Sequence, residues 1–219
     1  MSSLSKILPA YTPDLGGVCS ALFELGGMLI IHDAAGCTEN YTTYDEPRWF
    51  GSDALLFSSG LTEMDAIMGN DAHLIDRVVK AASLHQPKFI AIVGSPVPMV
   101  IGTDFDGIAY EVEEATGIPT FGFSTTSLGL YDKGAGEAFV KLAKRFCREK
   151  WPTRPGSLNL LGATPLDFSV GPTIPSLRDF FEGEGYRIIA SLAMDSTLEE
   201  IGRSTEAEVN VVLSASGLP

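Results

Sequence analysis

The sequence is poor in cysteine and in positive charge, and both shortages narrow the classes of protein to which it can belong. Three cysteines among 219 residues, an odd number, argue against a disulfide framework and favour a reducing compartment. Only 15 lysines and arginines stand against 28 acidic residues, which gives a net charge of -13. Such a chain would repel a phosphate backbone, so we expect no nucleic-acid partner.

Long apolar runs and nucleotide-binding loops are absent too. No stretch approaches the ~20 residues of a membrane span, and the amino terminus, MSSLSKILPAYTP, lacks the charged-then-apolar pattern of a signal peptide. We therefore expect a cytoplasmic protein with no membrane partner. The sequence contains neither a GxxxxGK[ST] loop nor a strand-linked GxGxxG motif, which argues against binding ATP or a dinucleotide by these devices.

Apolar runs of strand length alternate with amphipathic stretches along the chain. Residues 89–93 and 118–123 are apolar without polar alternation, which is typical of strands buried on both faces of a parallel sheet. Between them, Asp104 is a predicted helix cap and Gly117 a predicted helix end. Another helix is predicted around residues 74–82. The pattern predicts an α/β fold with Rossmann-like parallel sheets flanked by helices.

Two prolines and a glycine in WPTRPGS, residues 151–157, predict a domain boundary. We assign residues 1–154 to a first Rossmann-like domain and residues 155–219 to the start of a second. The second contains predicted strands at 158–161, 186–192 and 209–213 and predicted helices at 175–182 and 198–203. Because the chain stops after a strand of the buried type, we expect this domain to be incomplete and the chain to be a fragment of a longer polypeptide.

Cys19 and Cys37 stand at the two ends of one predicted helix and strand, GGVCSALFELGGMLIIHDAAGC. Cys19 is predicted in the first helical turn, where the helix dipole favours a thiolate. Cys37 is predicted in the loop after the strand at 28–31, at the sheet edge where parallel sheets place ligands. Helix and strand are antiparallel neighbours, so we expect both thiols to face one site. Soft thiolates select iron-sulfur clusters or zinc.

Other reactive residues have simpler alternatives. Cysteine often packs as a small hydrophobe, and Cys147 shares a predicted helical face with Phe139 and Ala143, so we expect it in the core. His32 and Asp33 lie in the loop before Cys37. The histidine is a candidate for orienting a ligand or passing a proton, and the carboxylate for replacing a thiolate on iron. Loop capping is the alternative role for both.

Several motifs resemble the nitrogenase component 1 type oxidoreductases. HDAAGC, residues 32–37, resembles that family's HGPxGC. LLFSSGLTEMDAIMGNDAHLIDRVVKA, residues 55–81, is similar to its TDLTExDxVFGGxxKLxxAI. VIGTDFDGIAYEVEEATGIP, residues 100–119, resembles LIGDDI...EEETGIP, and NLLG, residues 159–162, resembles the opening of its second domain.

The resemblance implies an iron-sulfur cluster held between two facing subunits, 8Fe-7S in nitrogenases and 4Fe-4S in relatives that reduce tetrapyrroles. Cys19 and Cys37 match the family's first two ligands. The third ligand position aligns with Ser95-Pro96, and proline cannot bind a metal. Two copies of Cys19 and Cys37 across a twofold axis would supply four thiolates, the usual complement of a 4Fe-4S cluster.

The implied function is that of an oxidoreductase subunit in a homo- or hetero-dimer. It would take electrons from a separate ATP-dependent iron-sulfur reductase protein and deliver them to an unknown substrate. The family's SLGHH motif reads SLGLY here, at residues 127–131, which argues against dinitrogen reduction. Two alternatives remain: a scaffold on which metal cofactors are assembled, and a cluster-free regulatory relative.

Overall fold

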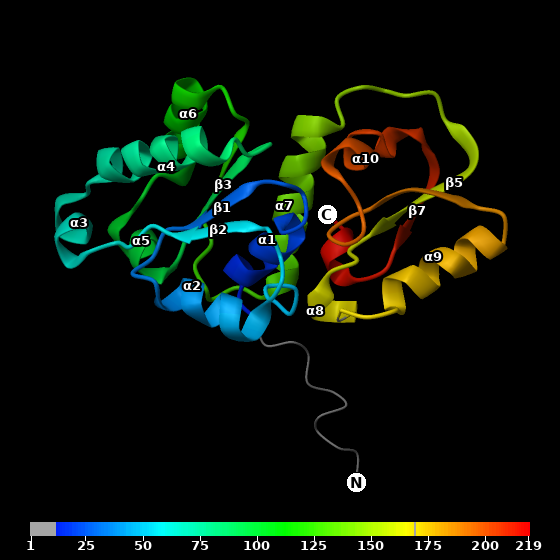
Figure 1. The fold of residues 1–219 in the computed structure, drawn as a ribbon, viewed down its shortest axis with the longest axis horizontal. Coiled ribbons are helices and arrows are strands. Elements are labelled where there is room, and N and C mark those ends of the chain that lie inside the picture. Colours follow the sequence, from blue (N-terminus) through cyan, green and yellow to red (C-terminus); the bar gives the residue numbers. More distant parts are fainter. Residues whose placement is uncertain (1–11, 169) are drawn as a thin grey trace, which may run out of the picture.

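Two parallel β-sheets form the framework of the protein, with helix α7 (Tyr131–Phe146) between them (Figure 1). The computed structural model describes residues 12–168 and 170–219. The first sheet contains β1 (Met28–Ile31), β2 (Leu55–Ser58), β3 (Ile90–Val93) and β4 (Thr120–Phe123), in the order β2-β1-β3-β4. All neighbouring strands are parallel. The α/β fold with parallel sheets is therefore confirmed.

Helices cover both faces of the first sheet. On one face, α4 (Asp71–His85) and α6 (Phe105–Thr116) pack against the side chains of Met28, Ile30, Ile90 and Ile92. On the other, α1 (Asp14–Leu22) and α7 pack against the alternate residues of the same strands. Burial on both faces explains why these strands lack polar alternation. No helix in the described part of the chain is long and apolar enough to cross a membrane.

The helix predicted between β3 and β4 forms as expected. The Asp104 side chain caps α6 by accepting a hydrogen bond of 3.0 Å from the backbone of Gly107. The helix ends at Gly117, which has the left-handed φ of 70° that glycine adopts at little cost. Short helices fill the other connections of this sheet: α2 (Gly36–Asn40), the π-helix η2 (Tyr41–Asp45), α3 (Glu63–Met68) and α5 (Pro96–Ile101).

The second sheet has three parallel strands in the order β6-β5-β7. They are β5 (Arg154–Leu161), β6 (Arg187–Ser191) and β7 (Ala207–Val212), and the helical segments around them are α8 (Pro165–Phe168), α9 (Thr173–Gly183), α10 (Leu198–Gly202), η3 (Ser204–Glu206) and η4 (Ala215–Gly217). β5 begins at Arg154, one residue before the predicted start of the second domain. The division into two domains stays a prediction.

Helices α1 and α7 approach closely because a glycine of each helix faces the backbone of the other helix. A Cβ atom on Gly17 would collide with the carbonyl oxygen of Tyr131, and one on Gly134 would collide with that of Asp14. Asp14 also accepts hydrogen bonds from the backbone of Thr126 and Ser127, at 3.1 and 2.8 Å. These contacts hold α1, and with it Cys19, in a fixed place beside the sheet.

The two sheets share one apolar cluster, which we call the central cluster. It contains residues of α1, α7 and the first sheet, and it continues into the second sheet and α10 through Ala190, Leu192, Leu198 and Ile201. Polar contacts link the same parts: Tyr131 donates to Asp167 at 2.6 Å, and Lys88 pairs with Glu199 at 2.8 Å.

Candidate functional site

Polar residues that follow three strands meet at the carboxyl edge of the first sheet. His32 follows β1, Ser59 follows β2 and Ser95 follows β3. The His32 backbone donates to the carbonyl of Val93 at 2.8 Å, and the Ser95 hydroxyl donates to the carbonyl of His32 at 2.7 Å. These bonds continue the strand pairing beyond the strand ends. Ligand sites of open parallel sheets lie at this edge.

Cys19 lies inside helix α1 and not in its first turn. The helix begins at Asp14, so Cys19 is its sixth residue, and its side chain is fully buried in the central cluster. Burial raises the pKa of the Cys19 thiol, and the nearby Glu46 and Asp33 carboxylates raise it further. The prediction of a first-turn position, where the helix dipole would favour a thiolate, is wrong, and the burial of Cys19 disfavours the thiolate instead.

Cys37 follows β1 as predicted and forms the second residue of the short helix α2. Its side chain is half-buried and packs against the central cluster. Burial raises the pKa of the Cys37 thiol, and Asp33 adds to this effect. The residue before α2, Ala35, has a left-handed backbone with φ 81°. The chain therefore makes a sharp, strained turn immediately before it presents Cys37.

Both cysteines contact the same central cluster, and one carboxylate, that of Asp33, acts electrostatically on both. Soft thiols in apolar surroundings suit an iron-sulfur cluster better than a hard cation. Two thiols are half the usual complement of four. Within residues 12–168 and 170–219, no group of three or more histidine, cysteine and acidic side chains is placed to hold a metal ion. The donors fit such a cluster only if a second subunit supplies the others and if Cys19, which is fully buried in this chain, becomes accessible at the interface.

Asp33 holds the turn that carries Cys37. One carboxylate oxygen accepts from the Thr38 backbone at 2.9 Å, and the other accepts from the hydroxyls of Thr38 and Ser58 at 2.9 and 2.6 Å. Both oxygens are therefore occupied by α2 and β2. This geometry matches the loop-capping alternative and leaves Asp33 poorly placed to replace a thiolate on iron.

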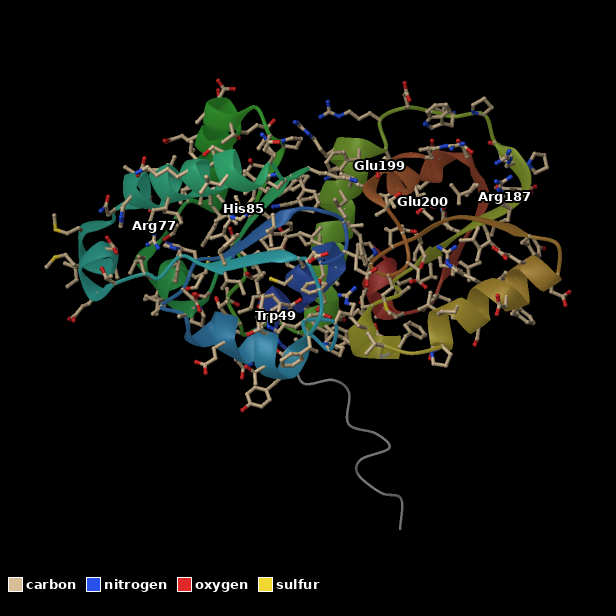
Figure 2. The ribbon with its side chains drawn as sticks, in the orientation of Figure 1. Trp49, Arg77, His85, Arg187, Glu199 and Glu200 are labelled. Carbon is tan, nitrogen blue, oxygen red and sulfur yellow. The ribbon has the colours of Figure 1, made fainter. Side chains whose placement is uncertain are left out.

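His32 is buried beside this turn with one ring nitrogen engaged. Its Nδ1 lies 2.8 Å from the Ser59 hydroxyl, which itself donates to the Asp33 carbonyl at 3.2 Å. A hydroxyl has one hydrogen, so Ser59 can donate either to Nδ1 of His32 or to the Asp33 carbonyl, and the tautomer of His32 sets which bond forms. Burial lowers the pKa of His32. The carboxylates of Asp71, Asp33 and Asp65 raise it, but by less than burial lowers it. The ring lines a small polar pocket together with His73 and Arg77, which is labelled in Figure 2.

The third ligand position of the resembled family carries no metal-binding atom. Pro96 is the first residue of α5, a favourable place for proline because the missing N–H has no helical partner there. Ser95, the residue before the helix, uses its hydroxyl on the carbonyl of His32. Both residues have structural roles.

A buried ion pair near Cys19 was not predicted from the sequence. Arg48 binds Glu46 through Nε at 2.7 Å and through Nη2 at 2.8 Å, and Glu46 also accepts from Ser20 and Tyr41 at 2.9 Å each. Burial raises the pKa of Tyr41 well above its ordinary value, and the charge of Glu46 raises it further. Arg48 also donates to the carbonyl of Ala193, beyond β6, at 3.0 Å. Glu46 and Arg48 lie two residues apart in a connection between elements, and no periodic pattern in the sequence predicts that they pair.

Cys147 is less buried than we expected. Helix α7 ends at Phe146, so Cys147 is its C-cap, half-buried against the central cluster. Its thiol lies 3.1 Å from the carbonyl of Ile201 and 3.2 Å from the hydroxyl of Ser204. The expectation of a core position is corrected: Cys147 lies where α7 meets the second sheet.

Comparison with known proteins assigns the chain to a family. The family model described as Nitrogenase component 1 type Oxidoreductase matches residues 14–219. The chain therefore belongs to the nitrogenase component 1 type oxidoreductase family, and the resemblance of its motifs is confirmed.

Individual relatives refine this assignment. The chain is 26% identical over 169 residues to the nitrogenase iron-molybdenum cofactor biosynthesis protein NifE of Methanosarcina barkeri, covering 71% of this chain and 35% of that protein. It is 23% identical over 197 residues to the nitrogenase molybdenum-iron protein alpha chain of the same organism, covering 84% and 36%. The solved structure of nitrogenase Cp1 at pH 5 matches with a TM-score of 0.79 and 20% identity, covering 99% of this chain and 46% of that one. The chain thus spans little more than a third of the two relatives' length.

Proposed function

We propose that this chain belongs to a nitrogenase-like oxidoreductase subunit in which Cys19 and Cys37 bind an iron-sulfur cluster at an interface with a similar subunit. The proposal is supported by two observations: both thiols contact one apolar cluster, and the Asp33 carboxylate raises the pKa of both. Apolar surroundings limit solvent access and so influence the reduction potential of a cluster.

Four thiolates from two subunits would hold a single 4Fe-4S cluster, with two copies each of Cys19 and Cys37 around a twofold axis. Either a homodimer or a heterodimer with a related chain satisfies this count. Asp33 supports the arrangement because it fixes the start of α2, which carries Cys37. When bound, the cluster would supply one-electron transfer at low potential.

Electrons would come from a separate ATP-dependent iron-sulfur reductase protein in the cytoplasm. The absence of the common ATP and dinucleotide motifs from the sequence is consistent with an external donor. The substrate that receives the electrons is not specified by these residues. A chemistry other than dinitrogen reduction is favoured by SLGLY at residues 127–131.

Anaerobic reconstitution of the native polypeptide with iron and sulfide tests the cluster. We expect about four irons per dimer and the broad visible absorption of thiolate-bound iron. Cys19→Ser and Cys37→Ser should each abolish both signals. In a homodimer each substitution removes two of the four ligands of the shared cluster, so the double variant should be no worse than either single one.

Cys147→Ser is the matched control for these variants. It removes a thiol of intermediate burial whose contacts are with Ile201 and Ser204, so the iron content should not change. Full iron retention in Cys19→Ser or Cys37→Ser would defeat the proposal and favour the cluster-free regulatory relative. Loss of iron in Cys147→Ser, with an unchanged circular dichroism spectrum, would show that Cys147 is itself a cluster ligand.

A scaffold for metal-cofactor assembly is the second candidate. It is supported by the similarity to a relative named for iron-molybdenum cofactor biosynthesis, at 26% identity. A transfer assay distinguishes the two functions. A scaffold should pass metal from the reconstituted protein to an acceptor apoprotein, whereas an oxidoreductase should keep its iron and oxidise the reduced reductase protein when substrate is present.

A further inference from the structure

Three arginines meet at the amino-terminal end of the second sheet. Arg154 is the first residue of β5, Arg187 is the first residue of the neighbouring strand β6, and Arg203 directly follows α10. Their side chains line one hollow of about 130 Å³ together with Glu200 and Glu206. Figure 2 labels Arg187 and Glu200 in this part of the molecule. The parallel pairing of β5 and β6 brings the first two arginines to the same edge.

The acidic residues of the hollow do not balance this positive charge. Glu206 is nearly buried, with 8% of its side chain exposed, and binds Arg203 through Nε at 2.6 Å. Glu200 is occupied by capping α10, accepting from the backbone of Thr197 at 2.9 Å. Arg154 and Arg187 have no ion-pair partner in the described part of the chain. Three cations against two carboxylates leave an excess of positive charge in a chain of net charge -13.

One of the three arginine side chains of the hollow, that of Arg203, is already held in place. The Arg203 guanidinium is fixed on one side by Glu206 and lies 5.7 Å from the centre of the Trp151 ring. Its Nη groups make no hydrogen bond to the described residues, so their donors are available. Like charges that line one hollow repel each other, and an anion between them would relieve the repulsion while it accepts their hydrogen bonds.

We propose that this hollow binds a phosphate-sized oxyanion, held by Arg154, Arg187 and Arg203. The guanidinium group presents paired N–H donors that match two oxygens of a phosphate, which suits arginine to such a ligand better than lysine. The ligand is either free phosphate or the phosphate group of a small ester. This site shares no residue with the cysteine site, so the two proposals stand or fall separately.

Titration of the native polypeptide with inorganic phosphate tests the site, with sodium chloride holding the ionic strength constant. The arginine Nε–Hε signals in a nitrogen-proton NMR spectrum are the readout, because they report the ligand at the side chains themselves. We expect saturable shifts of the signals of these three arginines. Phenyl phosphate in a parallel titration distinguishes a site that accepts esters from one restricted to the free ion.

Substitutions in opposite directions sharpen the test. Arg187→Gln should weaken phosphate binding about tenfold, because it removes one charge and its donors. Glu200→Gln should strengthen binding, since it removes a negative charge while keeping a side chain that can cap α10. Arg148→Gln, an exposed arginine outside the hollow, is the matched control and should bind as the unaltered protein does. The absence of saturable shifts, or equal affinity in Arg187→Gln, would overturn the proposal.

Discussion

At the scale of single residues, the turn before Cys37 holds strain that a substitution can release. Ala35 has φ 81° and ψ -17°, a conformation that glycine adopts freely and alanine does not. Ala35→Gly should raise the free energy of unfolding by about 0.5–1 kcal/mol, the relief of strain exceeding the extra chain entropy of glycine in the unfolded state. Urea unfolding of both proteins measures the difference.

Ala34→Gly is the control for this turn, because Ala34 is exposed and lacks a positive φ. Glycine there brings only the entropic cost, so the variant should be equal in stability or slightly weaker. If Ala35→Gly destabilised the protein as much as Ala34→Gly, the strain at Ala35 would not exist in solution.

His32 should make stability depend on pH. Burial lowers its pKa in the folded protein below the ordinary 6.5, so the unfolded chain binds the proton more tightly. The stabilising contribution of neutral His32 is therefore fully present above pH 6.5 and falls as the pH drops through 6.5 toward the folded-state pKa. His32→Asn removes this titration, so its unfolding free energy should decline less than that of the parent between pH about 7.5 and about 5.5. If the unfolding free energies of the two proteins, measured in urea, declined equally with falling pH, the assignment of this effect to His32 would be refuted.

The sequence predicted the position of His32, Asp33 and Cys37 in the fold better than it predicted the environment of Cys19. The order of β1, His32, Asp33 and Cys37 indicated a shared sheet edge, and the structure has them there. The environment of Cys19 was missed because we placed this residue in the first helical turn, whereas the helix begins at Asp14 and approaches α7 closely at Gly17. Cys19 is buried by α7, which lies more than a hundred residues further along the chain, and such burial leaves no pattern in the sequence around Cys19.

At the scale of elements, the buried ion pair joins α1, η2 and the connection that follows them. Glu46→Gln keeps the size of the side chain but leaves the Arg48 guanidinium, 8% exposed, with the 33% exposed Glu24 as its remaining ion-pair partner among the described residues. Breaking one side of a buried pair typically costs about 3–5 kcal/mol. Because Glu24 still faces Arg48, we expect a loss of about 2–3 kcal/mol by urea or thermal unfolding. Asp76→Asn breaks the exposed pair of Asp76 with Lys80 within α4 and should cost less than about 0.5 kcal/mol. Equal losses in both variants would show that the Glu46 network does not stabilise the fold.

Elements marked by caps or by uninterrupted apolar runs were predictable, and the short helices were not. The ends of α6 follow from the Asp104 cap and the Gly117 stop, and β3 and β4 follow from their apolar runs. Helices α2, α3 and α5 contain five or six residues each, too few for a helical period to show. The capping box between Thr62 and Asp65 that begins α3 is a signal that the sequence does contain.

At the scale of the whole molecule, the position of Cys19 protects it from reagents as long as the chain is folded. Its side chain is fully buried, whereas Cys37 and Cys147 are half-buried. In the iron-free protein, a maleimide should therefore modify Cys37 and Cys147 well before Cys19, which should react only through opening of the fold. Peptide mass spectrometry over time measures the three rates. In about 2 M urea the rate at Cys19 should rise most steeply, because opening becomes more frequent. Modification of Cys19 as fast as that of Cys37 would place it at the surface.

The strand pairing of the two sheets also sets an order in which the molecule can assemble during its synthesis. Every strand pair is parallel, so none forms as a local hairpin and each waits for a long crossover to be made. The first sheet is complete in sequence at Phe123, while the second begins only at Arg154 and needs β7, which ends at Val212. A ribosome adding about 5–20 residues per second therefore exposes all four strands of the first sheet seconds before the last strand of the second exists. The earlier sheet has this interval in which to pair correctly, and the later one then forms against a surface that is already built.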